Sequence, residues 1–393
     1  MTTWPTKKLV EVCDLQRGNE PGSRTYNEEG RGIRFIRVAD ISKQRTSPIW
    51  TTGKNLVICN KNDILMTFDG SPGVVFRGIE GAISSGIRII KPKNSKELFD
   101  DFLFYVLQTE PVQNTVKKYT IGVSICHASK SIPHIEIPLP PIEIQKQIVA
   151  KIEKLFEKID KAKELREKAL EETEQILQSA LQEIFSKAEK KYNKKEIKDF
   201  ATVKGGKRLP KGSRFSNIET DYPYIRVMDF KDFSVDASNL KYISKEIQQK
   251  ISRYIISKDD VYISIAGTIG LVGTIPDNLD GANLTENAAK IVLKDKKIVD
   301  KRYLVYYLAS PSGKVEINKK TNKVGQPKLA LMRIEIIKVP LPPLSEQKKI
   351  VAYLDDLREK VGKLKQLQQK QLEELNELKN SILEKAFKGE LAE

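Results

Sequence analysis

The stretch Pro138–Val149 reads PLPPIEIQKQIV, and the pattern returns 202 positions later, where Pro340–Val351 reads PLPPLSEQKKIV. The paired prolines end the preceding segment because they cannot donate backbone hydrogen bonds, and proline suits the first turn of a helix. Each copy therefore marks a change from strand to helix. Because an internal repeat of this length decides the architecture, we predict a duplicated chain with two globular units.

A long helix is expected after each copy of this motif. Residues 143–190 contain no Gly or Pro and consist mostly of residues that helices tolerate or favour. Apolar residues recur at alternating spacings of four and three, which is the 3.5-residue period of a coiled-coil seam. The seam begins with Ile148, Ile152, Leu155 and Ile159 in the first helix and with Ile350, Leu354, Leu357 and Val361 in the second.

The two apolar stripes predict that the helices pair as an antiparallel coiled coil of about 65 to 70 Å, with one globular unit at each end. The alternative is that each helix packs on its own globular unit. The pattern continues through Ile176, Leu364 and Leu378. Polar residues in the middle of the seam are expected to weaken the pairing and to fix its register; they are Arg166, Thr173, Gln368 and Gln371.

The sequences of the two globular units are also related as an internal repeat. Residues 34–40 match 223–229, residues 63–73 match 260–270, and residues 104–107 match 305–308, at offsets of 189, 197 and 201. The matched pieces are β-branched and aromatic runs of strand length. We predict an α+β fold with an internal pseudo-two-fold repeat, in which two similar domains of twisted sheet and short helices are joined by the two long helices. The expected segments are a first domain at 1–142, a helix at 143–190, a second domain at 191–343, a helix at 344–388 and a tail at 389–393.

The positive charge lies in the globular units. The chain carries a net +16, of which +5 falls in residues 1–142 and +12 in residues 191–343, while the two helices carry only −1 and +2. An excess confined to two repeated units predicts two binding footprints for a polyanion. The alternative is an ordinary solvated basic surface.

Few residues favour catalysis or metal binding. His127 and His134 lie in the first unit without acidic or Cys partners at ligand spacing, so we expect neither to bind metal or to act in acid–base chemistry. No G-x-x-x-x-G-K-[ST] loop is present. Cys13, Cys59 and Cys126 form no CxxC pair, which fits a reducing compartment. The apolar runs are short and the first twelve residues are charged, so we expect a cytoplasmic protein without membrane contact.

Basic loops punctuated by glycine lie in corresponding places of the two units, where they suit phosphate contacts and, through arginine, guanine recognition. Arg37 and Arg226, with Asp40 and Asp229, occur in both copies, so they are expected to form internal ion pairs or phosphate contacts. Residues that differ between the copies are expected to read bases, although ordinary solvated charge remains the alternative for each. The differing residues are Arg24, Arg31, Lys207, Arg208, Lys211, Gln326 and Lys328. The full set of candidate DNA-binding residues is Arg17, Arg24, Arg31, Arg34, Arg37, Lys204, Lys207, Arg208, Lys211, Arg214, Arg226, Gln326 and Lys328.

This pattern resembles the specificity subunit of type I restriction-modification systems. The resemblance rests on the two copies of the Pro-Pro-Gln motif, on the loops around Gly122 and 325–329 before them, and on their spacing, and it covers essentially the whole chain. It implies two target recognition domains, each reading one half of a split double-stranded DNA target. One departure is that the first copy has Glu143-Ile144-Gln145 where the second has Ser345-Glu346-Gln347, which affects local capping.

The resemblance also implies that the coiled coil sets the spacing between half-sites and docks methyltransferase subunits, which connect to restriction and translocase subunits. The chain itself is then not an enzyme and binds no cofactor or metal, and S-adenosylmethionine, ATP and Mg are expected on the partner subunits. The residues expected to form this docking and coiled-coil surface are Gln145, Ile148, Ile152, Leu155, Ile159, Gln347, Ile350, Leu354, Leu357 and Val361. Two alternatives remain. One is a restriction or methyltransferase enzyme that binds DNA by itself, and the other is a structural coiled-coil protein whose basic domains bind RNA or anionic surfaces.

Overall fold

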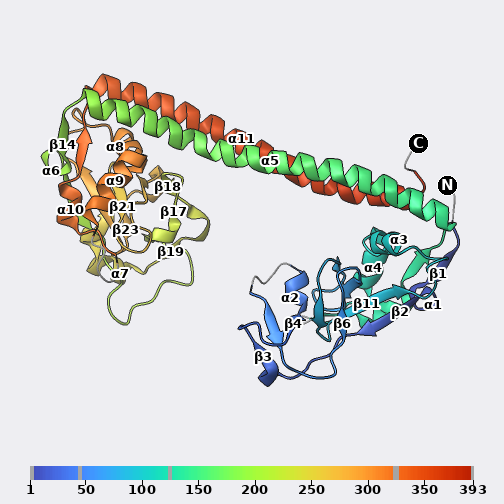
Figure 1. Cartoon of the computed structure of the whole chain (residues 1–393). Helices are drawn as coiled ribbons and strands as arrows, with labels where there is room; N and C mark the ends of the chain where they lie inside the picture. Colours follow the sequence, from blue (N-terminus) through green and yellow to red (C-terminus); the bar gives the residue numbers. More distant parts are fainter. Residues whose placement is uncertain (1–3, 43–46, 123–125, 322–326, 391–393) are drawn as a thin grey trace. The chain divides into compact units, whose positions relative to one another are not determined.

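The computed structural model of the chain (Figure 1) describes residues 4–42, 47–122, 126–321 and 327–390. The chain forms two compact units. The first comprises Met1–Glu167 with Lys370–Glu393, and the second comprises Lys168–Gln369. Each unit therefore contains one globular domain and a part of both long helices, α5 (Ile142–Lys191) and α11 (Leu344–Phe387).

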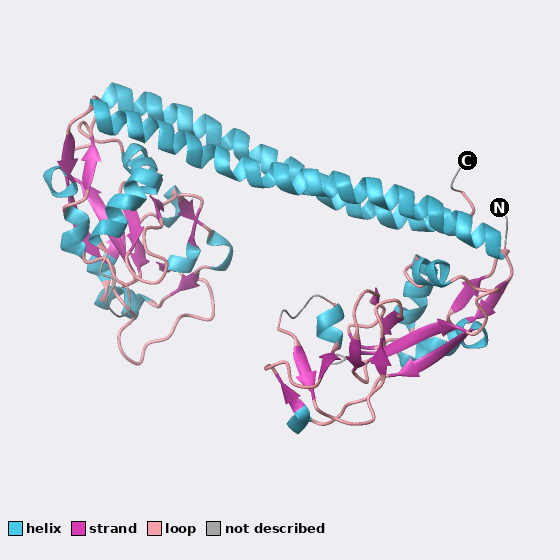
Figure 2. Cartoon of the chain, viewed as in Figure 1, coloured by secondary structure: helices cyan, strands magenta, loops and turns pink. Residues whose placement is uncertain are grey.

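The first domain is built on two sheets. Helices at its surface are short, and strands dominate its interior (Figure 2). The four-stranded antiparallel sheet has the order β2 (Cys13–Arg17), β11 (Ile87–Pro92), β7 (Ile64–Thr67) and β9 (Val75–Phe76). The five-stranded sheet has the order β3 (Tyr26–Asn27), β5 (Ile49–Thr51), β4 (Ile33–Ile36), β10 (Gly81–Ile83) and β6 (Ile58–Cys59), and its β4 and β10 are parallel.

Short elements complete the first domain. Two strand pairs join β1 (Thr6–Lys8) to β13 (Glu136–Pro138) and β8 (Asp69–Gly70) to β12 (Cys126–His127). The short helices are α1 (Leu9–Val12), α2 (Val38–Ile41), α3 (Asp100–Val106) and α4 (Glu110–Lys118), with 3₁₀ turns η1 (Ser23–Thr25) and η2 (Ser129–His134).

The second domain repeats this topology. Its antiparallel sheet has the order β15 (Ala201–Gly205), β24 (Ala288–Leu293), β21 (Val261–Ser264) and β22 (Val272–Thr274). Its other sheet has the order β19 (Lys241–Tyr242), β16 (Pro223–Ile225), β23 (Ala282–Leu284) and β20 (Ile255–Ile256), and the β16–β23 pair is again parallel. The two domains thus share their strand order, apart from the additional β3 in the first.

The smaller elements of the second domain follow the first only in part. Two strand pairs join β14 (Lys194–Glu196) to β25 (Lys338–Pro340) and β17 (Phe230–Lys231) to β18 (Ser234–Val235). The helices are α6 (Ile197–Phe200), α7 (Lys245–Lys250), α8 (Lys301–Ala309), α9 (Pro311–Lys320) and α10 (Leu331–Glu335), and the 3₁₀ turns are η3 (Val227–Asp229), η4 (Ala237–Asn239), η5 (Ser252–Tyr254) and η6 (Asp277–Leu279).

The long helices pair antiparallel within each unit. In the first unit, Asp160 of α5 meets Lys379 of α11, and Lys163 meets Asn376. In the second unit, Glu174 meets Lys365. The residue number on α11 falls as the number on α5 rises, which only antiparallel helices produce. The predicted fold class, including the antiparallel pairing, is therefore confirmed.

The alternative expectation, that each helix packs on its own domain, also holds at the helix starts. Ile148 and Ile152 are buried in the core of the first domain, together with Leu383 from the end of α11. Val351 and Leu354 are buried in the core of the second domain. Both packing modes coexist because each helix is long enough to contact a domain core near both of its ends, as Phe185 of α5 does in the second domain, and the other helix in between.

The predicted seam is wrong at three positions. Ile176, Leu364 and Leu378 are 41%, 41% and 45% exposed. Gln368 and Ile382, which follow Leu364 and Leu378 in the same pattern, are buried, so the three exposed positions are local departures from the 3.5-residue repeat. Other apolar positions take up the contact, including Leu181 and Leu372, which are buried.

The polar centre of the predicted seam lies in the contact between the helices at Thr173 and Gln368. Both are buried, and the Gln368 amide donates to the Thr173 hydroxyl at 3.1 Å. The Thr173 hydroxyl in turn donates to the carbonyl of Ala169. The Gln368 Oε1 is buried without a hydrogen-bond partner, so the pair is only partly satisfied, and moving the two side chains apart would leave the Gln368 amide donor buried and unpaired as well.

Candidate nucleic-acid interface

The motif glutamines anchor the long helices to the domains. Gln145 is fully buried, accepts a hydrogen bond from the amide of Phe99 at 2.8 Å, and donates to the carbonyls of Glu97 and Pro140. Gln347 makes the same three bonds, with the amide of Asp300 and the carbonyls of Ile298 and Pro342. We therefore correct the prediction that these two side chains dock a partner subunit, because the chain itself satisfies their polar atoms in its interior.

The remaining seam residues that we predicted also pack within the chain. Ile148, Ile152 and Ile159 are buried in the first unit, as are Leu354 and Val361 in the second. Leu155, Ile350 and Leu357 are partly buried. These side chains form the interior of the helix bundle, so a protein partner of the helices would contact their outward-facing neighbours.

Strand register makes the two domains comparable residue by residue. Arg17 of β2 lies opposite Arg88 of β11, and Gly205 of β15 lies opposite Ala289 of β24 in the same position of the second sheet. The backbone of Asp69 pairs with that of His127 in the β8–β12 ladder, and the backbone of Ala266 pairs with that of Lys328 at the corresponding place in the second domain. The offsets of 188, 197 and 201 that follow from these pairs are constant within each strand, so the residues in and next to these strands have defined counterparts in the other domain.

We call the matched glycine and buried hydroxyl positions of the two sheets the buried frame, and these positions are alike in both domains. Gly18 and Gly206 approach the neighbouring strand so closely that a Cβ atom would collide with the carbonyl of Ser84 or Thr285. The buried hydroxyl of Thr67 accepts from the amide of Val74, and Ser264 accepts in the same way from Leu271. The buried frame thus requires particular small or hydroxyl residues, and it holds the adjoining exposed positions in place.

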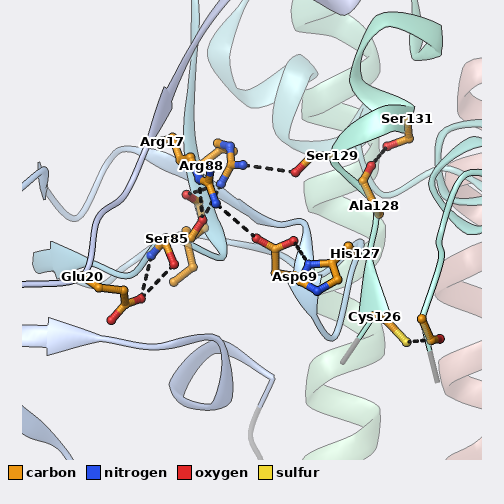
Figure 3. A network of polar contacts seen from close by, with 12 residues as sticks. Arg17, Glu20, Asp69, Ser85, Arg88, Cys126, His127, Ala128, Ser129 and Ser131 are labelled. Atoms are coloured by element: carbon orange, nitrogen blue, oxygen red, sulfur yellow. Dashed lines mark hydrogen bonds and ion pairs between the residues drawn. The ribbon is translucent and has the colours of Figure 1, made fainter. Parts of the chain in front are cut away.

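In the first domain, polar side chains from β2, β8 and β12 converge at one end of the antiparallel sheet (Figure 3). Asp69 lies between two cationic or polar groups. Its Oδ1 is 2.7 Å from Nδ1 of His127, and its Oδ2 is 4.0 Å from the Arg17 guanidinium. The Arg17 Nε also donates to the carbonyl of Ser85 at 3.1 Å. The carboxylate is mostly covered, with 18% of its side chain exposed, whereas 62% of Arg17 and 56% of His127 face solvent.

Two further polar residues support this cluster. Arg88 is only 5% exposed and donates to the carbonyls of Ser85 and Ile87 and to the hydroxyl of Ser129. Burial, and secondly the neighbouring Arg17 guanidinium, lower the pKa of Arg88. Glu20 accepts hydrogen bonds from the amide and the hydroxyl of Ser85, each at 3.0 Å. The loop carrying Ser85 is therefore fixed from both sides.

In the second domain the same positions carry other side chains. Arg208 stands where the first domain has Glu20, and its Nε donates at 2.6 Å to Glu286, which stands in the place of Ser85. Burial alone would raise the pKa of Glu286, but hydrogen bonds from Arg208 and Thr285 outweigh it and lower that pKa. Lys328 is exposed in the place of His127. The arginine is 78% exposed and is aligned by a carboxylate that is 29% exposed.

The other predicted DNA-binding residues fall into two groups. Arg37 pairs with Asp40, and Arg226 pairs with Asp229, in identical local geometry, so the internal ion pairs that we considered are present. Most of the others are exposed in loops or at strand ends, where Arg31 pairs with Glu29 and Lys207 lies over the Tyr254 ring. These exposed residues are Arg24, Arg31, Arg34, Lys204, Lys207, Lys211 and Arg214. Gln326 lies outside the described residues.

Sequence reasoning missed the acidic and neutral members of these clusters. It selected candidates by positive charge, and so it omitted Glu20, Asp69 and Glu286 and set His127 aside. The signal was present, because the matched segments 63–73 and 260–270 already place Asp69 opposite Ala266. His134, the other histidine, stacks on the Tyr119 ring at 4.2 Å between centroids.

A family model described as the type I restriction modification DNA specificity domain matches residues 1–172 and again residues 189–375. The chain belongs to this specificity family. The predicted resemblance is thereby confirmed, and membership implies recognition of DNA sequence. The two separate matches agree with the two domains that repeat in the structure.

Curated relatives from this family cover different shares of the chain. The specificity subunit of the type I restriction enzyme EcoBI from Escherichia coli is 31% identical over 175 residues, which is 44% of this chain and 36% of that one. The MjaVIII specificity subunit of Methanocaldococcus jannaschii is 26% identical and covers 98% of this chain and 89% of its own length. The matched part thus spans about a third of the first relative but most of the second.

Solved structures support the specificity fold. A chain from a structure that describes complex assembly and conformational transition of the type I R-M system aligns with a TM-score of 0.74, at 23% identity, over 99% of this chain and 98% of its own. The HsdS subunit from Thermoanaerobacter tengcongensis aligns with a TM-score of 0.53, at 24% identity, over 99% and 97%. At this level of identity the likeness concerns the fold.

The described part of the specificity chain offers neither a membrane span nor a cluster of metal ligands. None of its helices combines the length and the apolar character needed to cross a bilayer. Among the same residues, no group of three or more His, Cys, Asp or Glu side chains is arranged to hold a metal ion.

Proposed function

We propose that this chain is the sequence-specific double-stranded DNA-binding subunit of a type I restriction-modification complex, and that each domain reads one half of a bipartite target. One observation carries this proposal. The two domains share a buried frame, but the exposed polar side chains on that frame differ at matched positions. A frame used twice with different exposed chemistry suits two readers of different sequences.

The distribution of charge supports the same reading. The excess of +5 and +12 lies in the two domains, where exposed lysines and arginines can neutralise phosphates and release counterions. The long helices are nearly neutral in sum and present outward-facing polar residues. They would set the spacing between half-sites and dock methyltransferase subunits, through which restriction and translocase subunits join.

In this proposal the chain is not an enzyme. Methyl transfer with S-adenosylmethionine, and translocation and cleavage with ATP and Mg, belong to the partner subunits, and the complex acts in the cytoplasm. An incubation of the purified chain with S-adenosylmethionine and DNA should give no methylated product. Transfer by the chain alone would favour the alternative of an autonomous enzyme.

Selection from a random library of DNA duplexes tests the binding proposal. The full chain should enrich a motif with two unrelated halves separated by a fixed number of unspecified base pairs. The measurement is made at fixed salt with competitor DNA, because an affinity without a specificity ratio does not distinguish a sequence reader from a general polyanion binder. Equal binding to all duplexes and to RNA would refute the proposal.

The spacing role has its own test in the helix register. Residues 160–166 lie opposite 373–379 in the first unit, because Asp160 pairs with Lys379 and Lys163 with Asn376. Deleting both segments removes one heptad from each helix and shortens the pair by about 10 Å, or about three base pairs. The selected motif should keep both halves and lose about that many base pairs between them. Altered halves would contradict the spacing role.

A further inference from the structure

Arg17 and His127 are exposed side chains that the protein holds in place before any ligand arrives. Arg17 is fixed at Nε by the Ser85 carbonyl and lies near the Asp69 carboxylate, yet its guanidinium keeps further N–H donors. The His127 ring is fixed by its 2.7 Å contact with Asp69. Such anchoring lowers the entropy cost of binding for each side chain.

The chemistry of the cluster suits base edges rather than phosphates. The carboxylate of Asp69 stands beside the exposed Arg17 cation, and the carboxylate of Glu20 binds Ser85, whose carbonyl Arg17 contacts; both negative charges would disfavour a phosphate here. The edges of bases are neutral and present both donors and acceptors. Arginine matches O6 and N7 of guanine. Because a carboxylate accepts, the Nδ1 of His127 donates to Asp69, which leaves Nε2 for a hydrogen bond with a base edge.

Comparison with the second domain distinguishes residues that contact bases from residues that maintain the fold. Gly18 with Gly206 and Thr67 with Ser264 keep the same character in both copies, whereas the buried Arg88 has Ala289 as its counterpart. At the exposed and half-buried positions of the cluster the copies exchange chemistry. The matched pairs are Arg17 with Gly205, Glu20 with Arg208, Asp69 with Ala266, Ser85 with Glu286 and His127 with Lys328. If the cluster served only the fold, the same frame would not accept such different side chains.

We propose that Arg17 and His127, aligned by Asp69, contact base edges of one half-site, and that Arg208, aligned by Glu286, and Lys328 contact base edges of the other. The inference rests on the proposed function and names the side chains that carry it. In the first domain the contacting residues are Arg17 and His127, and in the second they are Arg208 and Lys328. Asp69 and Glu286 are positioning residues, which act through these side chains.

The test compares full-chain variants in the same duplex selection. Arg17→Ala and His127→Ala should each lower the preference at positions of one half-site by about 10- to 100-fold, which is the discrimination of one good base contact. Arg208→Ala and Lys328→Ala should do the same in the other half-site. Lys96→Ala removes an exposed cation beyond the opposite end of β11 and should leave both halves unchanged.

Each variant contains its own folding control, because the untouched domain must still select its half-site. Asp69→Ala places in the first domain the residue that the second domain carries at this position, Ala266. Asp69→Ala should lower the base preference at the half-site positions that His127→Ala affects. The double variant Asp69→Ala, His127→Ala should lose no more preference at those positions than His127→Ala alone. A purely structural role for Asp69 would instead lower binding to all duplexes.

The outcomes separate the two claims. A wild-type chain that selects no motif overturns the proposed function and this inference with it. A wild-type chain that selects a two-part motif, with variants that keep both halves and lose affinity equally for all sequences, overturns the inference alone and assigns these residues to phosphate contacts. Variants that change one half-site each, in the domain-specific manner described, support both.

Discussion

The Gln145 side chain offers a sharp test of how the long helix is anchored, and Gln145→Met is the change to make. Methionine is close to glutamine in length but has no amide, so it fills the buried space and removes three hydrogen bonds, to Phe99, Glu97 and Pro140. Each such bond contributes about 1 kcal/mol net. We therefore expect the free energy of unfolding of the first unit to fall by about 3 kcal/mol.

Tryptophan fluorescence during urea unfolding measures this loss selectively. Both tryptophans of the chain, Trp4 and Trp50, lie in the first unit, so their signal follows that unit. Gln147→Met is the matched control, because Gln147 is exposed two residues further along the same helix, and surface substitutions of this kind change stability by less than about 0.5 kcal/mol. Gln347→Met removes the equivalent bonds from the second unit and should leave the tryptophan transition near its wild-type position.

Hydrogen exchange provides an independent readout at one atom. The Phe99 amide donates to Oε1 of Gln145, and a loss of about 3 kcal/mol corresponds to roughly 100-fold faster exchange through opening. The reasoning is refuted if Gln145→Met unfolds at the wild-type urea concentration and the Phe99 amide keeps its protection. That result would mean that the bonds only replace equally good bonds to water.

Three further changes have expected outcomes. Gly362→Ala, in an exposed turn of α11 with open space around the new methyl group, should stabilise the chain by about 1 kcal/mol in thermal unfolding. Gly206→Ala should destabilise it by about 3 kcal/mol, because the added Cβ collides with the Thr285 carbonyl; a wild-type melting temperature would contradict this. Burial raises the pKa of the Cys13 thiol to about 12, so Cys13 should resist alkylation at pH 8 in the folded chain. The unfolded thiol ionises from about pH 9, so stability should also fall with rising pH between about 9 and 12, and a Cys13→Ala variant should lack that part of the decline.

The repeat, the long helices and their antiparallel pairing follow from the sequence for physical reasons. Absence of Gly and Pro over some 48 residues, with a sustained apolar period, leaves few alternatives to a long helix. The Pro-Pro segment fixes where each helix begins, and α5 and α11 start at Ile142 and Leu344. The seam failed at Ile176, Leu364 and Leu378, which are exposed although Gln368 and Ile382 of the same pattern are buried, because a sequence period gives the average contact face and not the packing at each position.

The sheets and the binding cluster were harder to predict. Strand order depends on contacts between residues distant in the chain, and β4 pairs with β10 across about 50 residues, which no local pattern encodes. Candidate residues chosen by charge alone included Arg37 and Arg226, which the structure engages in ion pairs with their own neighbours. Charge indicates that a surface binds polyanions, but the partner of each cation decides which cations remain available.

The separation of buried frame from exposed cluster has a consequence for how such a chain changes its target. A half-exposed residue such as His127 can become Lys, as its counterpart Lys328 shows, because its side chain fills no packed space. Gly18 cannot change in the same way, since backbone of the next strand occupies the position of a side chain. Substitutions that alter the exposed cluster therefore cost little stability, whereas those that alter the frame cost several kcal/mol. Variation should accumulate at the matched exposed positions.

The triple variant Arg17→Gly, Asp69→Ala, His127→Lys gives the first domain the residues of the second at these positions. Its unfolding free energy should stay within about 1 kcal/mol of wild type, whereas the first domain should lose its half-site preference. A variant that fails to fold would show that the cluster belongs to the frame.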